Sequence, residues 1–114
     1  MTDNKYYTYA YLDPRKPGKF EYCISQDNSI KLDYEPIYIG KGKGKRDKYH
    51  LYLRNNTKTH NLHLTYKINK IIKESNKEPI IIRLKDNITE EESIFLEIKL
   101  IESIGRKDIH TGPL

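Results

Sequence analysis

The sequence predicts an α+β (α/β) domain in which helices flank a small mixed sheet of three or four strands. Tyrosines that alternate with other residues near the N-terminus have the period of a strand, and apolar residues spaced three and four apart later in the chain have the period of helices. The length of 114 residues suits one domain with a modest core, and no repeat or linker interrupts it. We therefore expect a single domain over residues 1–114.

Three strands are expected in the first 40 residues. The alternating tyrosines predict a strand with a tyrosine face over residues 7–12. Residues 13–18 read DPRKPG, which is turn chemistry, and we expect them to end that strand. Further strands are predicted over residues 20–25 and 36–40.

Two helices and a strand follow. The first helix is predicted from about Lys45 to Leu53, and the second begins near Thr59. Residues 80–84 (IIIRL) predict a buried strand. The apolar residues of the second helix recur at i, i+4, i+7 and i+8, as a buried face requires: Leu64, Ile68, Ile71 and Ile72.

The third helix has defined ends and an inward carboxylate. Thr89 and Glu92 form a capping-box pattern at its start, and Gly105 ends it. Glu97 lies on or beside the apolar stripe, because its neighbours three and four positions away are isoleucine and leucine. A carboxylate in that place requires a cation, a donor or a proton. A divalent metal with oxygen ligands and a salt bridge to a lysine or Arg46 both satisfy this requirement.

A glycine-lysine segment follows the third strand. Residues 38–46 read YIGKGKGKR. Glycines allow a close approach of the backbone and expose amide groups, and the interleaved lysines favour an anion such as phosphate. The patterns of the P-loop and of the dinucleotide fingerprint are both absent, which argues against a nucleotide cofactor. A solvated glycine turn with a basic rim is the alternative interpretation.

The charge distribution favours a nucleic-acid partner. Residues 36–73 carry ten Lys/Arg against one acid, Asp47, whereas the whole chain has a net charge of only +5. Such a concentrated basic block is typical of proteins that bind polyanions. The single cysteine, Cys23, excludes a disulfide or zinc cluster within the chain. Neither a membrane span nor a signal peptide is apparent, so we expect a soluble intracellular protein of the cytoplasm, the nucleus or a phage-infected cell.

Several side chains near this block can take part in chemistry. Arg46 and His50 are spaced i, i+4 and share a helix face, so the first can clamp a phosphate and the second can move a proton. A surface arginine and a packed imidazole are the structural alternatives. Tyr38 precedes the glycines and can meet a phosphate or act as a base. His60 and His63 lack a third metal ligand nearby and are the weaker candidates.

Together these residues resemble the GIY-YIG endonuclease domain, over nearly the whole chain. Residues 38–40 (YIG) are the second half-motif, and the degenerate first half is placed on residues 7–9 (YTY), with Tyr9 as its tyrosine and Tyr11 as the alternative register. The glycine-lysine loop and the GPL ending at Leu114 are similar to phage-type and LEM-domain-nuclease-like members.

The helical residues also match the family. Arg46 and His50 match its arginine and, four positions later, histidine, and Glu97 resembles its metal-binding glutamate. The resemblance implies that Glu97 holds one Mg²⁺ or Mn²⁺ during hydrolysis of a DNA phosphodiester. It further implies that Tyr9 deprotonates or orients the attacking water, with Tyr38 bonded nearby and His50 relaying the proton.

The resemblance also implies how DNA is held. Arg46, assisted by Lys41, neutralises the charge that grows on the phosphorus centre. The DNA backbone is expected to contact the basic residues of this region: Lys41, Lys43, Lys45, Lys48 and Arg54.

The chain departs from the family pattern in three places. The first half-motif lacks its glycine. Residues 13–36 make a longer spacer than in minimal members, which a hairpin insertion explains. The asparagine that usually follows GPL is absent before Leu114, so we expect either a C-terminal truncation or the loss of that role.

A weakly active or inactive nucleic-acid-binding module of the same fold is the competing hypothesis, and an interaction domain with solvated charges is the third. Only the enzyme requires Glu97 to face the tyrosines and Arg46 across one cleft. Double-strand cleavage would further require a homodimer or two visits, and the chain is expected to act alone or beside additional domains.

Overall fold

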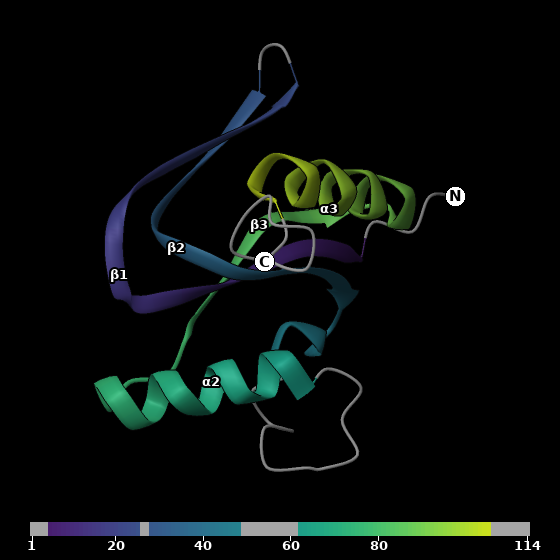
Figure 1. Ribbon diagram of the computed structural model, residues 1–114. Coiled ribbons are helices and arrows are strands. Elements are labelled where there is room, and N and C mark those ends of the chain that lie inside the picture. Colours follow the sequence, from purple (N-terminus) through teal and green to yellow (C-terminus); the bar gives the residue numbers. More distant parts are fainter. Residues whose placement is uncertain (1–4, 26–27, 49–61, 106–114) are drawn as a thin grey trace.

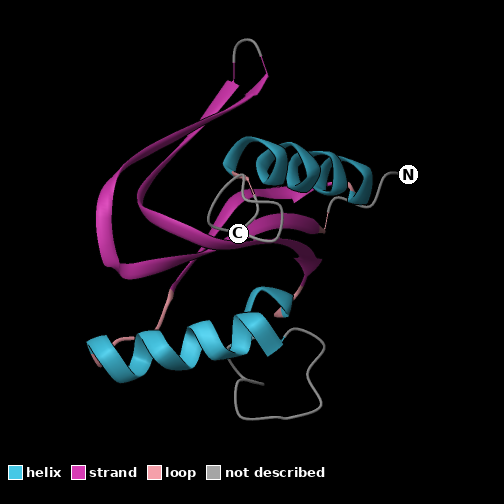
Figure 2. Cartoon of the chain, in the orientation of Figure 1, coloured by secondary structure: helices cyan, strands magenta, loops and turns pink. Residues whose placement is uncertain are grey.

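The computed structural model describes residues 5–25, 28–48 and 62–105 (Figures 1 and 2). Three strands, two α-helices and one short 3₁₀ helix make up this part of the chain, which confirms the α+β class. In chain order they are β1 (Tyr6–Ser25), β2 (Asn28–Lys43), η1 (Arg46–Lys48), α2 (Leu62–Ser75), β3 (Ile80–Ile88) and α3 (Glu90–Ile104).

The described strands form one sheet in the order β2-β1-β3. Both pairs are antiparallel, so the expectation of a mixed sheet was wrong. β2 and β3 do run in the same direction, but β1 lies between them, so no parallel pair forms among the strands that the structure describes. The sequence shows the strands without showing which of them are neighbours.

The turn predicted over residues 13–18 is also wrong, because β1 continues through this segment. Pro14 and Pro17 cannot donate to a regular ladder, and the register between β1 and β2 shifts on both sides of Pro17. Such irregularities bend a strand without ending it. Residues 13–25 and 28–36 thus form the outer part of the β1–β2 hairpin, which curves toward α3 (Figure 1).

The tyrosine face of β1 packs against α2. The side chains of Tyr7, Tyr9 and Tyr11 are at most 1% exposed, and they cluster with Leu64, Ile68 and Ile71. This confirms both the alternating strand and the apolar face predicted for the second helix. Neighbouring tyrosine rings meet edge-on or tilted at centroid distances of about 6 Å.

The opposite face of β1 packs against α3, so the two helices cover opposite faces of the sheet (Figure 1). Ala10 and Leu12 cluster there with Leu96, Leu100 and Ile104. The hydroxyl of Thr8, also on this face, donates to the carbonyl of Ser93 at 3.1 Å and ties β1 to α3.

The predicted ends of α3 are confirmed. The Thr89 hydroxyl accepts from the Glu92 N–H at 3.1 Å, the Glu92 carboxylate accepts from the Thr89 N–H at 3.3 Å, and Gly105 is the C-cap. Of the helix predicted from Lys45 to Leu53, the described part is the 3₁₀ turn η1, and the remainder lies outside the described residues. No helix within the described ranges is long and apolar enough to cross a membrane.

Candidate active site

The first part of the glycine-lysine segment, residues 38–43, is the end of strand β2, and successive side chains there point to opposite faces of the sheet. Cross-strand partners point to the same face of a sheet, and Gly40 lies opposite Tyr9 while Lys41 lies opposite Thr8. The glycines therefore share the tyrosine face, and Lys41 points to the face covered by α3. Hence the glycines at 40 and 42 belong to a paired strand, unlike both the anion-binding loop and the solvated turn considered from sequence.

Gly40 leaves room for the side chain of Tyr9. A Cβ at position 40 would lie 2.6 Å from the Cζ and hydroxyl oxygen of Tyr9, and 3.0 Å from Cε2 of Tyr38. Real Cβ atoms do not approach other atoms at 2.6 Å, so only glycine fits here without a shift. The tyrosine ring thus crosses β2 to reach the outer edge of the sheet, where Tyr38 stands.

Gly42 likewise leaves room for the side chain of Arg46. A Cβ at position 42 would overlap Cβ and Cγ of the arginine side chain. Gly44 has φ +63°, in the left-handed region that favours glycine, and it turns the chain from β2 into η1. This turn folds Arg46 back over the strand that it has just left.

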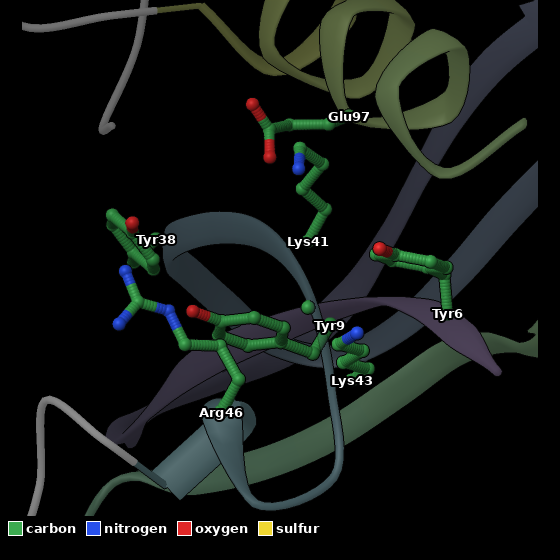
Figure 3. A pocket seen from close by; sticks show the side chains of 8 residues that line it. Tyr6, Tyr9, Tyr38, Lys41, Lys43, Arg46 and Glu97 are labelled. Atoms are coloured by element: carbon green, nitrogen blue, oxygen red, sulfur yellow. The ribbon is translucent and has the colours of Figure 1, made fainter. Parts of the chain in front are cut away.

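A pocket of about 370 Å³ lies at this edge of the sheet. Its lining residues come from β1, both faces of β2, η1 and α3: Tyr6, Tyr9, Tyr38, Lys41, Gly42, Lys43, Arg46 and Glu97. Figure 3 shows Glu97 descending from α3 beside Lys41, while Arg46 rises from η1 toward Tyr38. Residues as far apart in the sequence as Tyr6 and Glu97 thus face one cavity.

Two of the three pocket tyrosines, Tyr9 and Tyr38, keep their protons at neutral pH. Burial raises the pKa of Tyr9 far above its ordinary value, the charges of Tyr38 and Tyr11 add to this, and the positive charge of Arg46 opposes it. Burial also raises the pKa of Tyr38, as does the charge of Glu97. The two hydroxyls share a hydrogen bond. Both groups are thus hydroxyls that can donate and accept, and neither is a preformed phenolate.

Glu97 is half-buried and aimed at the pocket (Figure 3). Burial raises the pKa of its carboxyl, and the positive charge of Lys41 opposes this rise. The alternative of a salt bridge to a lysine or Arg46 is not seen among the described residues, where the ion pair of α3 joins Lys99 to Glu102. The Glu97 carboxylate therefore faces a polar cavity, where Lys41 supplies the positive charge that acts on it.

The donor set suits one hard divalent cation. No group of three His, Cys, Asp or Glu side chains that could hold a metal occurs in the described part of the chain. A single carboxylate on an open pocket is nevertheless the donor set that Mg²⁺ uses when water and substrate phosphate supply the other oxygens. A bound cation would add positive charge beside the half-buried carboxyl of Glu97, whose pKa burial raises despite the charge of Lys41.

The structure brings together most of the predicted site. Lys45 and Lys48 are exposed beside the pocket without lining it. His50, Arg54 and His60 lie outside the described residues, and His63 lies in the first turn of α2. Tyr11 is fully buried and does not line the pocket, which favours the register with Tyr9.

Sequence reasoning missed Tyr6, whose ring lies 5.9 Å from the Lys41 ammonium and 5.5 Å from that of Lys43. The sequence signal that could have pointed to Tyr6 is its position at the start of the tyrosine-rich strand, directly before Tyr7. The strand period sets Tyr6 and these lysines on one face of the sheet, and the register pairs Tyr6 with Lys43.

Comparison with known proteins agrees with this geometry. A sequence model of the LEM-3-like GIY-YIG domain matches residues 6–111. Searches of curated proteins and of solved structures found no match. The matched region contains the whole described sheet, both α-helices and every residue of the pocket, and the chain therefore belongs to the LEM-3-like GIY-YIG domain family, a nuclease family.

Proposed function

We propose that this chain is an endonuclease that hydrolyses DNA phosphodiesters with one Mg²⁺ or Mn²⁺ ion. The observation that carries the proposal is the shared pocket: a half-buried carboxylate from α3 faces three tyrosines, two lysines and an arginine at the edge of the sheet. These are the groups needed to hold a metal, orient a water and neutralise a phosphate.

Tyr9 orients the attacking water in this proposal. Its hydroxyl stays protonated at neutral pH, so it positions water by hydrogen bonds, and the hydrogen bond with Tyr38 sets the direction of its lone pairs. Removal of the proton from water then requires a further acceptor. His50 remains the predicted proton relay.

Arg46 and Lys41 bind the phosphate from opposite faces of β2. The guanidinium can form two parallel hydrogen bonds to phosphate oxygens, and Lys41 supplies a point charge. Lys43, Lys45, Lys48 and Arg54 extend this positive surface along the DNA backbone. Glu97 would hold the divalent cation, which when bound supplies Lewis-acid stabilisation of the phosphate and the leaving oxygen.

Nicking of supercoiled plasmid tests the proposal. We expect nicking that requires Mg²⁺ or Mn²⁺, stops with EDTA and is lost in Glu97→Gln. Glu102→Gln is the matched control, because Glu102 lies on the same helix with a carboxylate that is 65% exposed and paired with Lys99. Nicking by Glu97→Gln at the wild-type rate would refute the proposal.

A DNA-binding module without catalysis is the second candidate. The observation in its favour is Tyr7, which stands where the family's first half-motif has glycine. Salt-sensitive binding to the same plasmid without nicking, under every metal condition, is the result expected of this module.

A further inference from the structure

Asp47 is a buried acid in the most basic part of the chain. It is the only Asp or Glu in residues 36–73, and it is 6% exposed. It directly follows Arg46 in η1, yet it does not line the pocket. Its carboxylate points away from the pocket toward residues of two other strands.

Tyr7 of β1 and Arg83 of β3 both form hydrogen bonds with this acid. Arg83 Nε donates to Asp47 Oδ2 at 3.1 Å. The Tyr7 hydroxyl accepts from the Asp47 N–H at 2.8 Å and lies 3.2 Å from Asp47 Oδ1. The guanidinium of Arg83 also stacks over the Tyr7 ring, 4.0 Å from its centroid, so the three side chains form one closed cluster.

The same two residues hold the turn that precedes Arg46. The carbonyl of Gly44 accepts from the Tyr7 hydroxyl at 2.8 Å and from Arg83 Nη2 at 3.0 Å. The turn is therefore bonded on one side of Arg46 through Gly44 and on the other side through Asp47. Arg46 itself is exposed, and its own stem rests on Gly42.

We propose that Tyr7, Asp47 and Arg83 are positioning residues that fix the backbone on which Arg46 is presented to the phosphate. The inference rests on the proposed function, in which Arg46 binds the scissile phosphate. A planar guanidinium gains its two parallel bonds only when its stem is aligned. A misplacement of about 1 Å at such a site costs about 100-fold in rate.

A double-mutant cycle separates positioning from mere stability. Nicking rates of a duplex with Mg²⁺ are measured for wild type, Arg83→Ala, Arg46→Ala and the double variant. Arg83→Ala is expected to lower the rate about 10- to 100-fold in the wild-type background, and less than about threefold when residue 46 is already alanine. DNA affinity, measured by fluorescence anisotropy, is expected to stay within about threefold for Arg83→Ala, so that the loss falls on the rate.

Two milder variants cover the case in which Arg83→Ala does not fold. Tyr7→Phe keeps the ring and removes only the hydroxyl that bonds Gly44 and Asp47. Arg83→Lys keeps the charge near Asp47 but cannot reproduce the second bond and the stacking. Both variants are expected to lower the nicking rate less than Arg83→Ala does. In both, the loss is expected to shrink when residue 46 is alanine.

Arg15→Ala is the matched control. Arg15 also pairs with a buried aspartate, Asp13, at 2.8 Å and with a more exposed carboxylate, Glu74, at 2.7 Å, but it does not line the pocket. It is expected to lower the melting temperature, and to change the nicking rate by the same small factor whether residue 46 is arginine or alanine.

The outcomes are distinguishable. If wild type nicks and Arg83→Ala lowers the rate equally in both backgrounds, or not at all, the positioning role is wrong and the proposed function stands. If wild type does not nick, the proposed function fails, and the positioning role, which rests on it, fails with it.

Discussion

At the scale of single residues, Gly40 shows how a missing side chain builds the site. The ring of Tyr9 occupies the space in which any Cβ at position 40 would lie. Tyr9 reaches Tyr38 and the pocket through this gap, and the neighbouring Gly42 gives Arg46 the same passage. The two glycines therefore contribute to the site by leaving space for the side chains of Tyr9 and Arg46.

Gly40→Ala is expected to displace Tyr9 and to lower both stability and activity. Overpacking of this kind costs about 1–3 kcal/mol of unfolding free energy, and we expect nicking to fall by more than the unfolded fraction explains. Urea denaturation and nicking rates measure the two effects. Gly18→Ala is the control, since its Cβ would meet only the edge of the Phe20 ring at 3.1 Å. Equal rates for Gly40→Ala and wild type would contradict this account.

Glu97 is a second residue whose properties depend on one neighbour. Its pKa is raised by burial and lowered again by Lys41. A folded-state pKa above the unfolded value means that ionisation of Glu97 opposes folding, so its contribution to stability falls as pH rises through this range. Glu97→Gln is therefore expected to raise the melting temperature at neutral pH.

Lys41→Gln is expected to shift the titration midpoint of the Glu97 carboxyl upward, because the opposing positive charge is removed. NMR titration of labelled glutamate without metal measures the shift. Lys43→Gln is the control, since Lys43 lies on the same strand and is not among the charges that perturb Glu97. An unchanged midpoint in Lys41→Gln would show that the two groups do not interact.

At the scale of elements, the bend of β1 is tied to α2 by an ion-pair network. Asp13 is fully buried and accepts from the Arg15 backbone N–H at 2.9 Å and from its guanidinium at 2.8 Å. Arg15 continues to Glu74, on the last turn of α2. This network lies where the sequence suggested a turn. It therefore fixes the position of the bend in β1 relative to α2.

Arg15→Ala is expected to destabilise the fold by about 3–5 kcal/mol, because a buried carboxylate loses its partner. Burial alone would raise the pKa of Asp13, but the bonds and charge of Arg15 outweigh it and lower the pKa below 3.8. The network therefore stabilises the protein above the unfolded pKa, and this stability is lost as pH falls through the lower folded value. Thermal unfolding of wild type and Asp13→Asn between pH 2 and pH 7 checks this: the variant is expected to show the weaker acid dependence.

At the scale of the whole molecule, positive charge gathers around one edge of the sheet. Lys41, Lys43, Lys45, Arg46 and Lys48 follow one another along the end of β2 and η1, beside the pocket. The outer hairpin, by contrast, mixes acids and bases. DNA is thus expected to approach the edge formed by β2.

The salt dependence of DNA binding tests this approach. Each phosphate contact contributes about 0.9 to the slope of log K against log salt. Lys43→Gln and Lys48→Gln are each expected to reduce the slope by about one such contact. Lys16→Gln, in the hairpin and 3.6 Å from Glu35, is expected to leave the slope unchanged. Similar losses in all three variants would mean that binding does not centre on the pocket.

The parts of the fold that depend on neighbours along the chain were predictable. The period of the tyrosines predicted the buried face of β1, the spacing of leucine and isoleucine predicted α2, and the pattern of Thr89 and Glu92 predicted the start of α3. The inward direction of Glu97 followed from the same periodicity. Each of these signals acts over four residues or fewer.

What the sequence by itself determined is thus the nature of the elements and the residue types available at the site. Only the tertiary structure decided that β1 continues past Pro14, that β1 lies between β2 and β3, and that the glycines make room for Tyr9 and Arg46. It also joined Asp47 to Arg83, 36 positions apart. The physical reason is that strand pairing, close approach and burial depend on groups brought together by the fold, and these contacts outweigh the local preferences of prolines, glycines and charges.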